Sequence, residues 1–365
     1  MSSQSRNIRR QTVIERMMLS PNIRFWGIFF SLMILLVGAV VLAVAVGPVP
    51  IPYDTVVSIV IAKLFPGVIM VTWTPVQEQI VWVFRLPRVL LAVLVGATLS
   101  VSGTVLQALV RNPLADPYTF GVSSGASVGA VLVITLASSI IAGFTLPWAA
   151  FLGALLTMLL VYLLAQQGGQ ISTGRLILAG VAISYSLSAV TTFLVLRASS
   201  PGSNSAAIAL SWLAGSLGAA KWEQLGIPSL SLLVTTVLLL LQARQLNALL
   251  AGDETAISLG VNVPVLRLQL FFLTSLQVGT VVAVSGAIGF VGLMIPHMVR
   301  FWVGADHQRV LPIVILLGGT YLVLVDLIGR IIIAPSELPV GIVTAAVGGP
   351  FFLWLLQSKR TVGGI

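Results

Sequence analysis

The chain has 365 residues, of which 58% are hydrophobic and 8% are charged, and its mean hydropathy is +1.08. Soluble domains carry about 25% charged residues, so this composition excludes a soluble fold at a length that would otherwise suit two or three domains. The net charge of +9 is distributed as in membrane proteins rather than nucleic-acid-binding proteins, and the lack of cysteine excludes disulfides, thiolate metal sites and cysteine nucleophiles.

The two ends of the chain are basic. Arg6, Arg9, Arg10, Arg16 and Arg24 precede the first apolar segment, and Lys359 and Arg360 follow the last one. By the positive-inside rule, this pattern predicts a cytoplasmic extension at 1–24, a single transmembrane domain at 25–358 and a cytoplasmic tail at 359–365. Two cytoplasmic termini require an even number of spans. The first apolar run is too long for a cleavable signal peptide and has no small-residue cleavage pattern.

Ten spans are predicted from apolar segments of about membrane length. In chain order they are 25–46, 89–110, 118–141, 147–166, 175–196, 225–241, 268–285, 286–303, 310–333 and 340–356. No Asp, Glu, Lys or Arg occurs between Asp116 and Arg175, so that interval holds two of them. Apolar runs such as 230–241 do not alternate as porin strands do, and we therefore predict an all-α polytopic membrane protein.

The connections between spans hold most of the polar residues. The external segment 51–88 is expected to carry an amphipathic helix at 55–64 and to end in Arg85-Leu-Pro-Arg88. A turn at 168–174 joins the fourth and fifth spans, and the external segment 199–222 contains a short helix at 206–217. This topology leaves an unusual number of basic residues outside. They are Arg85, Arg88, Arg197, Lys221 and Arg330.

One sequence pattern occurs twice. Val95-Gly96-x-x-x-x-Val101-Ser102-Gly103 returns as Val278-Gly279-x-x-x-x-Val284-Ser285-Gly286. The two copies lie on spans separated by an odd number of crossings, so they run in opposite directions, as expected of an inverted-topology repeat. A chance match in a chain rich in valine, glycine and serine is the alternative.

No enzymatic constellation is evident. The histidines, His297 and His307, are ten residues apart with a glycine between them, too far for adjacent metal ligands on one helix face. No lysine follows a glycine, so the chain has no P-loop for ATP. The one carboxylate within a span is Asp326, and Arg330 at i+4 is its expected ion-pair partner. Without carboxylate relays for ion coupling, we expect an external source of energy.

The longest polar stretch between spans is 244–267. Within it, 252–260 is predicted to form a short helix, with Asp253 and Glu254 at the N-terminal end and Gly260 beyond the C-terminal end. It is either a connector lying on the membrane surface or a docking element for a motor subunit.

Several unrelated motifs occur in a characteristic order from about residue 47 onward. They are Arg85-Leu-Pro-Arg88; Ser102-Gly103 with Gln107; Arg111-Asn-Pro-Leu-Ala-Asp-Pro117; Gly121-x-Ser-Ser-Gly125; Leu178-Ala-Gly180; Ser211-Trp212-x-x-Gly215-Ser216; Leu259-Gly260; Gly289-Phe-x-Gly292-Leu-x-x-Pro296-His297-x-x-Arg300; Asp306-His307; Asp326 with Arg330; and Glu337-Leu-Pro-x-Gly341. With them the chain resembles the FecCD/BtuC-type permease family of ABC importers for iron–siderophore, haem and cobalamin.

This resemblance implies a type II ABC importer permease of ten helices, working as a dimer with a second copy or a close paralogue. Two cytoplasmic ATPases and an extracytoplasmic solute-binding protein are the other implied partners. ATP would be bound by the ATPase, and no cofactor, metal or catalytic residue is expected on this chain. The implied location is the bacterial cytoplasmic (inner) membrane. The solute prediction is a ferric siderophore, with haem or cobalamin as the alternatives.

The resemblance also assigns roles to residues by position. Docking of the binding protein falls on Arg85, Arg88 and Arg330, which would account for the outward basic residues. ATPase coupling falls on Gly252, Asp253, Glu254, Thr255, Ala256, Ile257, Ser258, Leu259 and Gly260. The cytoplasmic gate falls on Ser172, Thr173 and Gly174, where related proteins carry a hydroxyl side chain at the last position. A structural role falls on Arg111, Asn112, Pro113, Asp116, Pro117, Pro296, His297 and Arg300.

Two other classes of protein remain as alternatives. A self-powered secondary carrier or channel would take up solute without an ATPase and would depend on an ion gradient. A membrane-embedded enzyme would need a polar catalytic cluster, which the sequence lacks.

Overall fold

The computed structural model describes residues 21–136, 145–167, 170–171, 173–199 and 204–362, and this part of the chain is mainly helical. Its α-helices are α2 (Pro21–Ala45), α3 (Tyr53–Leu64), α4 (Pro75–Glu78), α5 (Leu86–Leu109), α6 (Val122–Leu136), α7 (Leu146–Ala165), α8 (Thr173–Arg197), α9 (Ser205–Leu213), α10 (Gly226–Leu241), α11 (Ala243–Leu250), α12 (Asp253–Ser258), α13 (Val263–Ser285), α14 (Val291–Val303), α15 (His307–Ile331) and α16 (Val340–Val362). The other elements are a π-helix, η1 (Gln79–Arg85), two 3-10 segments, η2 (Pro117–Phe120) and η3 (Trp222–Gln224), and a two-residue antiparallel pair, β1 (Gln166–Gln167) and β2 (Gln170–Ile171), in which Gln166 pairs with Ile171.

Within the described residues, ten apolar helical segments correspond to the ten predicted spans. Seven are long and apolar enough to cross a membrane: Asn22–Ala45, Pro75–Leu109, Leu146–Ala165, Gly174–Arg197, Trp222–Leu241, Val263–Ser285 and His307–Ile331. Three are shorter: Val122–Thr135, Val291–Val303 and Val340–Leu355. The predicted all-α polytopic fold is therefore confirmed.

The second span begins earlier than the sequence predicted. Helix runs without a break from Pro75 through η1 to Leu109, so Arg85 and Arg88 lie within a helix and not in an external connection. Proline inside a helix normally clashes with the carbonyl four residues before it. At Pro87 the preceding turn is π-helical, with the Leu86 N–H bonded to the Val81 carbonyl, and the wider turn accommodates the ring.

Other predicted boundaries need smaller corrections. The short external helix is α9, which ends at Leu213 and not at residue 217. Helix α16 continues to Val362, beyond the predicted span end at 356 and into the predicted tail. The amphipathic helix expected at 55–64 is present as α3.

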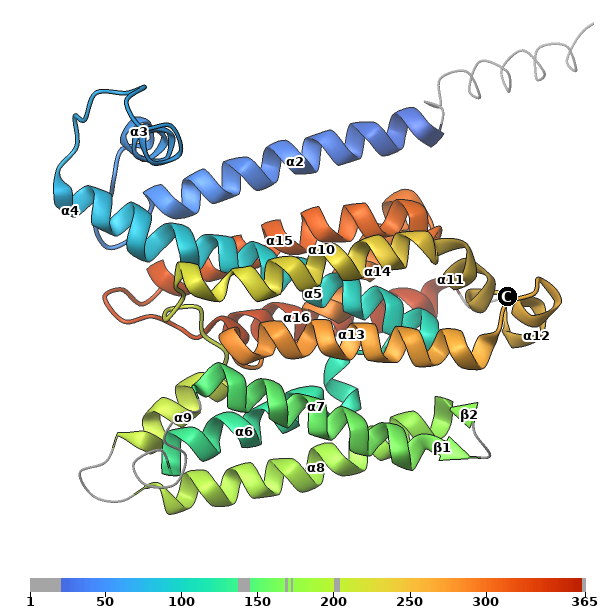
Figure 1. The fold of residues 1–365 in the computed structure, drawn as a ribbon. Helices are drawn as coiled ribbons and strands as arrows, with labels where there is room; N and C mark the ends of the chain where they lie inside the picture. Colours follow the sequence, from blue (N-terminus) through green and yellow to red (C-terminus); the bar gives the residue numbers. More distant parts are fainter. Residues whose placement is uncertain (1–20, 137–144, 168–169, 172, 200–203, 363–365) are drawn as a thin grey trace, which may run out of the picture.

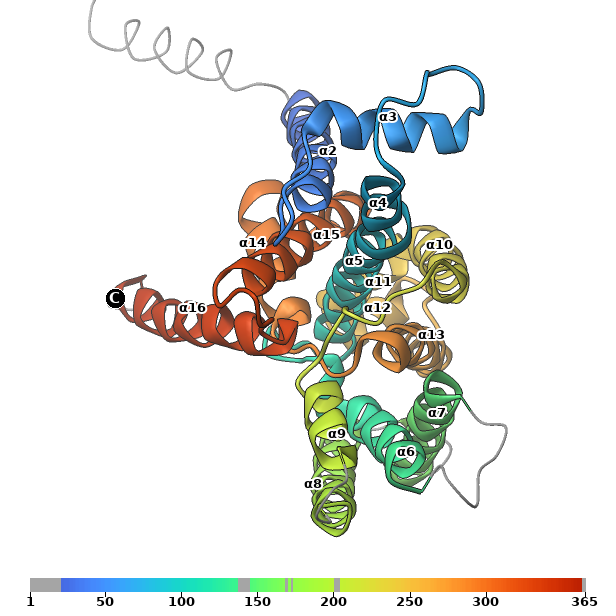
Figure 2. The ribbon, with the colours of Figure 1, turned by 90° about the vertical axis from the view of Figure 1, so that its left-hand side faces the viewer.

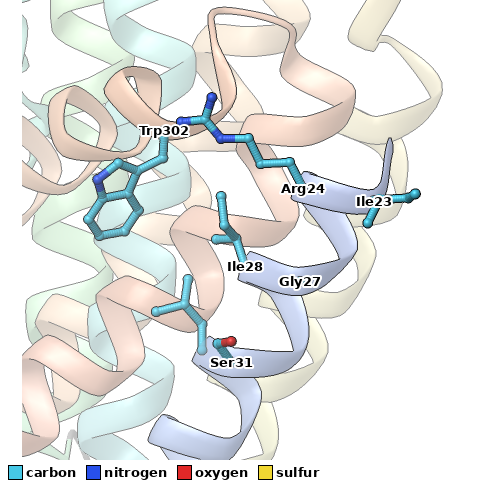
Figure 3. A pocket seen from close by; sticks show the side chains of 7 residues that line it. Ile23, Arg24, Gly27, Ile28, Ser31 and Trp302 are labelled. Carbon is cyan, nitrogen blue, oxygen red and sulfur yellow. The ribbon is translucent and has the colours of Figure 1, made fainter. Parts of the chain in front are cut away.

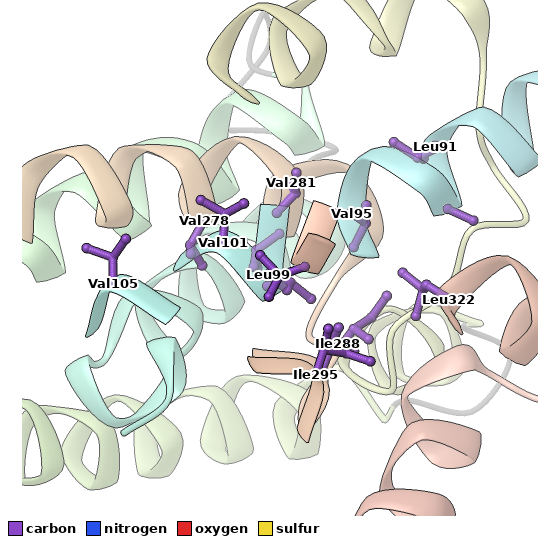
Figure 4. Packing of buried hydrophobic residues seen from close by; sticks show 14 of the residues in the cluster. Leu91, Val95, Leu99, Val101, Val105, Val278, Val281, Ile288, Ile295 and Leu322 are labelled. Carbon is purple, nitrogen blue, oxygen red and sulfur yellow. The ribbon is translucent and has the colours of Figure 1, made fainter. Parts of the chain in front are cut away.

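Helix α5 is the centre of the bundle, with α2, α13, α14 and α15 around it (Figure 2). In the most apolar window of its segment 83% of residues are buried, against 17% for α8 and 28% for α2. Its side chains interdigitate with apolar residues of α13, α14 and α15, as for Leu99, Val281 and Ile295 in Figure 4. Close approach requires glycine: a Cβ on Gly103 would overlap the Gly292 backbone, and one on Gly96 would overlap the Gly318 carbonyl.

The two ends of the bundle differ. The start of α2, the end of α16, helix α12 and the β1–β2 pair lie at one end, which we call the α12 end (Figure 1). Helices α3, α4 and α9 lie at the other, the α9 end (Figure 1). The first and last described residues are therefore on the same side, as an even number of spans requires.

Helices α6, α7, α8 and α9 form a group beside the central helices (Figure 2). Helix α13 joins this group to α5, because it packs against both α7 and α5. The two repeated glycine-containing segments lie on α5 and α13, and the Ser102 hydroxyl of one donates to Gln277 beside the other at 3.1 Å. The inverted repeat itself stays a prediction.

Candidate functional site

At the α9 end, one carboxylate lies between two arginines. The Asp326 side chain is fully buried on α15, and Arg88 of α5 donates to it through Nε at 3.0 Å and Nη2 at 2.9 Å. Arg330, one helical turn after Asp326, has its Nε 3.1 Å from Asp326 Oδ2. Glu337, in the connection to α16, accepts from Arg88 Nη1 at 2.7 Å and is 42% exposed. The predicted local pair between Asp326 and Arg330 is present, within a larger network.

Arg330 and a further arginine, Arg85, bind the backbone at the C-terminal end of α2. Arg85 donates to the carbonyl oxygens of Val44 at 2.8 Å, Ala45 at 2.9 Å and Val49 at 2.6 Å, and Arg330 donates to Ala43 at 2.9 Å. The last carbonyls of a helix have no hydrogen-bond donor within the helix and carry partial negative charge. The two guanidinium groups supply the missing donors and a compensating positive charge. Gly47 leaves room for Arg85, because a Cβ at that position would overlap the guanidinium.

These contacts correct the predicted exposure of the three arginines. Arg85 is 7% exposed, Arg88 is 9% and Arg330 is 3%, so the three do not present free positive charge on an outer surface. The predicted order of spans placed these three arginines on the external side. In the structure, each guanidinium is bound by a carboxylate or a backbone carbonyl of this chain. Docking of a binding protein through these arginines stays a prediction. A partner would first meet Glu337, the exposed member of the network.

At the α12 end, a second carboxylate lies between two arginines. Asp253 is the first residue of α12; Arg267 of α13 donates to both of its oxygens at 2.9 Å, and Arg111, after α5, lies 3.6 Å from Oδ1. The Asp253 side chain is 33% exposed. One side chain therefore ties α12 to the helix that precedes the Arg111 loop and to the helix that follows α12.

Helix α12 is bounded by two glycines in conformations that favour glycine. Gly252 has φ +118° and Gly260 has φ +80°. The predicted helix at 252–260 is thus present as Asp253–Ser258, and the acidic residues lie in its first turn as predicted. Its neighbour α11 lies against it, with one apolar face on the core through Leu246 and Leu249.

Apolar side chains of the α12 region point away from the bundle. Ala256 is fully buried, whereas Ile257 is 60% exposed and Leu259 is 68% exposed. Glu254 and Thr255 are exposed beside them. Helix α12 thus buries one face and presents a mixed apolar and acidic face at the α12 end.

The loop of the Arg111–Pro117 motif is held by its own polar side chains. Arg111 adopts a left-handed conformation, with φ +51°. Asn112 accepts from the Leu114 N–H, and Asp116 accepts from the Tyr118 N–H, each at 2.9 Å, so Asp116 caps η2. Burial raises the pKa of the Asp116 carboxyl to about 6, and the bond from Tyr118 opposes that rise. Pro117 begins η2 and lies beside Gly292 at the start of α14.

The second predicted structural motif lies on α14, where Pro296 is buried. Arg300 donates to the Gln107 side chain of α5, and Gln107 in turn donates to the Gly292 carbonyl at 3.1 Å. The ring of His297 lies edge-on to Phe301, with their centroids 4.9 Å apart. The Gln107 contacts join α14 to α5 close to the Arg111 loop, whereas the His297–Phe301 contact lies within α14.

His307, the other histidine, belongs to a separate contact. Asn247 of α11 accepts from the His307 backbone N–H at 3.0 Å and lies 2.7 Å from its ring Nδ1. The Asn247 amide donates to Asp306 at 2.7 Å. This fastens α11 to the start of α15, and Asn247 was not singled out in the sequence. In the part of the chain that the structure describes, no group of three or more His, Asp and Glu side chains could hold a metal ion.

The predicted gate is described in part. Ser172 lies outside the described residues. Thr173 begins α8, and Gly174 follows it with open space where a side chain would be. Before them the chain makes the β1–β2 pair, so the turn between α7 and α8 is a small hairpin at the α12 end (Figure 1).

Sequence reasoning missed the second carboxylate–arginine group. Arg111 belongs to a recognised motif, and Asp253 and Arg267 lie in the polar stretch 244–267. Asp253 is separated from the two arginines by 142 and 14 positions, and nothing in the local pattern joins the three. Complementary charge at the same predicted end is the signal that could have suggested it.

Comparison with known families gives one match over most of the chain. The sequence model of the FecCD transport family matches residues 34–358.

Similar proteins carry several solutes. The chain is 38% identical over 357 residues to a cobalamin import system permease protein of Halobacterium salinarum, covering 90% of this chain and 95% of that protein. It is 44% identical over 284 residues to a hemin transport system permease protein of Yersinia pestis, covering 77% and 84%. It is 41% identical over 286 residues to an Fe(3+) dicitrate transport system permease protein of Escherichia coli, also covering 77% and 84%.

A solved structure has the same fold. It is described as an inward-facing conformation of a metal-chelate type ABC transporter. The TM-score is 0.77 at 35% sequence identity, and the match covers 91% of this chain and 99% of that one.

Proposed function

The chain belongs to the FecCD transport family and is the permease of an ABC importer, and on this premise we propose that it imports a ferric siderophore in a homodimer driven by a separate ATPase. The observation that best supports the dependence on an ATPase is the position and exposure of α12. It is a short helix held in place by Asp253, and it exposes Ile257 and Leu259 at the α12 end. The sequence has no P-loop of its own.

The coupling step follows from how α12 is attached. Asp253 connects it by ion pairs to Arg267 at the start of the α13 span and to Arg111 at the end of the α5 span. A push on α12 by a nucleotide-driven partner would therefore reach the central helix and its neighbour together. On this proposal the α12 end faces the cytoplasm, and the first and last described residues are on that side.

The solute preference rests on relatives and not on a pocket in this chain. Permease names among them include cobalamin, hemin and Fe(3+) dicitrate, and the solved structure is of a metal-chelate type transporter. Hemin and Fe(3+) dicitrate are iron compounds, which supports a ferric siderophore, whereas the relatives named for cobalamin or vitamin B12 support the alternative. Haem or cobalamin is the alternative.

The pathway is proposed between two copies of the chain. Helix α8 is the least buried long span, and large apolar side chains such as Leu178 and Phe193 are exposed along it, at 71% and 60%. Helix α16 lies apart from the central helices in Figure 2 and exposes Ile342 and Val347. Rocking of α8 and α16, with the hairpin before α8 as the gate, would open the pathway to alternate sides.

Docking of the binding protein is proposed at the α9 end. The exposed Glu337 carboxylate forms an ion pair with Arg88, and an acidic residue of a binding protein could replace Glu337 in that pair. Arg85 and Arg330 would then act by holding the end of α2 and not by direct contact.

Reconstitution tests the proposal. The chain is placed in liposomes with its ATPase and binding protein, and uptake of radiolabelled ferric siderophore, haem and cobalamin is measured with each protein omitted in turn. We expect uptake only with all components and ATP, and the highest rate for ferric siderophore. Uptake by the chain alone, driven by an ion gradient, would support a secondary carrier. A higher rate for haem or cobalamin would correct the solute while leaving the importer role intact.

A further inference from the structure

A groove between α2 and α14 at the α12 end is unused by the transport proposal. Its cavity volume is about 560 Å³. Figure 3 shows Arg24 and Trp302 beside the same opening, Arg24 from the first turns of α2 and Trp302 from α14. Ile28, Ser31 and Leu32 of α2 continue the lining away from the α12 end. The groove therefore has a cationic mouth and an apolar floor.

The space in this groove is left by a small residue. Gly27 lines it, and a Cβ at Gly27 would meet nothing within 4 Å. Helix α2 packs mainly on α15, and only 28% of its most apolar window is buried, so α2 leaves a long apolar surface beside the groove. An occupant with an extended hydrocarbon part would be accommodated without moving the backbone.

The positive charge at the opening of the groove favours an occupant with an anionic head group. Arg24 is exposed and is the charged residue of the lining. Arg309 is close by, because its guanidinium donates to Asn22 in the first turn of α2 at 3.2 Å. The N-terminal end of α2 lies here and adds partial positive charge, whereas that of α15 is capped by the Asp306 carboxylate. In the sequence, Arg6, Arg9, Arg10 and Arg16 precede this position.

A cavity of similar size at the α9 end gives a contrast. It has a volume of about 550 Å³ and is lined by Trp148 and Phe151, with Lys221 and Glu223 at its polar part. Opposite charges there balance one another. The two cavities are therefore similar in volume, and they differ in that only the α2–α14 groove has an excess of positive charge.

We propose that the α2–α14 groove binds an anionic phospholipid of the cytoplasmic leaflet, with the phosphate at Arg24 and Arg309 and an acyl chain along Gly27, Ile28 and Leu32. Tryptophan is favoured at the level of lipid headgroups, and Trp302 stands there. Basic residues next to a membrane are attracted by anionic lipid. The site would anchor the start of α2 to the bundle, independently of which solute is carried.

Native mass spectrometry of the full-length permease tests this. The protein is released from nanodiscs of equimolar phosphatidylglycerol and phosphatidylcholine, and retained lipids are counted. We expect retention of phosphatidylglycerol over phosphatidylcholine, and Arg24→Gln should lower that preference about fivefold, the effect of one basic residue near an anionic surface. Gly27→Leu fills the groove and should abolish the preference. Gly38→Leu is the matched control, since Gly38 lies on the same helix, outside the groove, and also has open space around it.

The outcomes separate clearly. Equal retention of the two lipids by the unmodified protein would overturn the proposal, as would Gly27→Leu retaining phosphatidylglycerol as well as Gly38→Leu does. If Gly27→Leu changed the oligomeric mass and left the lipid count unchanged, the groove would be a contact between copies of the chain and the proposal would be wrong.

Discussion

The two ends of the bundle use the same chemical group in different surroundings. At the α9 end, Asp326 lies between Arg88 and Arg330 with no exposed side-chain surface; at the α12 end, Asp253 lies between Arg111 and Arg267 with a third of its side chain exposed. Breaking a buried ion pair leaves a charge without water or partner, whereas an exposed pair contributes little to stability. The first group should therefore fix the fold, and the second should be free to transmit a motion.

The largest expected effect is at the buried carboxylate. Asp326→Asn leaves Arg88 and Arg330 without their shared negative charge, and we expect a loss of about 3–5 kcal/mol in unfolding free energy. The measurement is thermal unfolding of the purified protein in detergent, with yield as a second readout. Asp54→Asn, at an exposed position in α3, is the control. Equal stability of the two variants would contradict the assignment of Asp326 to the fold.

The next effect concerns contact with a partner at the α12 end. Ile257→Asp removes an exposed apolar side chain, and we expect ATPase affinity to fall about 30-fold, or about 2 kcal/mol, if that side chain is buried in the complex. Unfolding of the permease alone should not change. Ser258→Asp, at the neighbouring exposed position, adds the same charge and is the control. An equal loss in both variants would mean that charge, and not apolar contact, determines the binding.

How far the sequence predicts these two groups differs between them. Asp326 and Arg330 are one turn apart, and their pair was predicted; Arg88 lies 238 positions before Asp326, and only the folded bundle brings it there. The spans were predictable from their apolar segments, most of which have membrane length. Arg85 and Arg88 were misplaced because a Pro87 flanked by charges is typical of a connection, whereas a π-helical turn keeps it in the helix.

The α12 end was predicted better than its internal contacts were. Gly252, Gly260 and the two acidic residues mark the short helix from local pattern alone, and α12 is present at that position. Complementary charge could suggest an ion pair at this end, but that Asp253 pairs with Arg111 depends on how α5 and α13 pack. Local signals thus gave the element, and tertiary packing determines its attachment.

A smaller effect on stability, and a specific one on transport, is expected at Asp253. Asp253→Asn weakens two partly exposed ion pairs and should cost at most about 1 kcal/mol of unfolding free energy. Because α12 is then less firmly joined to α5 and α13, the solute transported per ATP hydrolysed should fall about fivefold, the equivalent of that same 1 kcal/mol. The ratio is measured in proteoliposomes. The control is Asp54→Asn, an exposed carboxylate on α3 at the opposite end of the bundle. An unchanged ratio in Asp253→Asn would show that α12 is only a connector.

The smallest expected effect is at Glu337, the exposed carboxylate of the α9-end network. Its pair with Arg88 is partly exposed, so Glu337→Gln should change unfolding free energy by less than about 1 kcal/mol. If an acidic residue of the binding protein competes for Arg88, removing the internal competitor should tighten capture about threefold at low salt, and screening should remove the gain at about 1 M salt, where charges interact over only about 3 Å. Capture is measured by titrating labelled binding protein onto the permease in nanodiscs. Glu223→Gln, also at the α9 end, is the control. Weaker capture in Glu337→Gln would mean that Glu337 itself contacts the partner, and the α9 end would then resemble the α12 end in presenting its own side chains for binding.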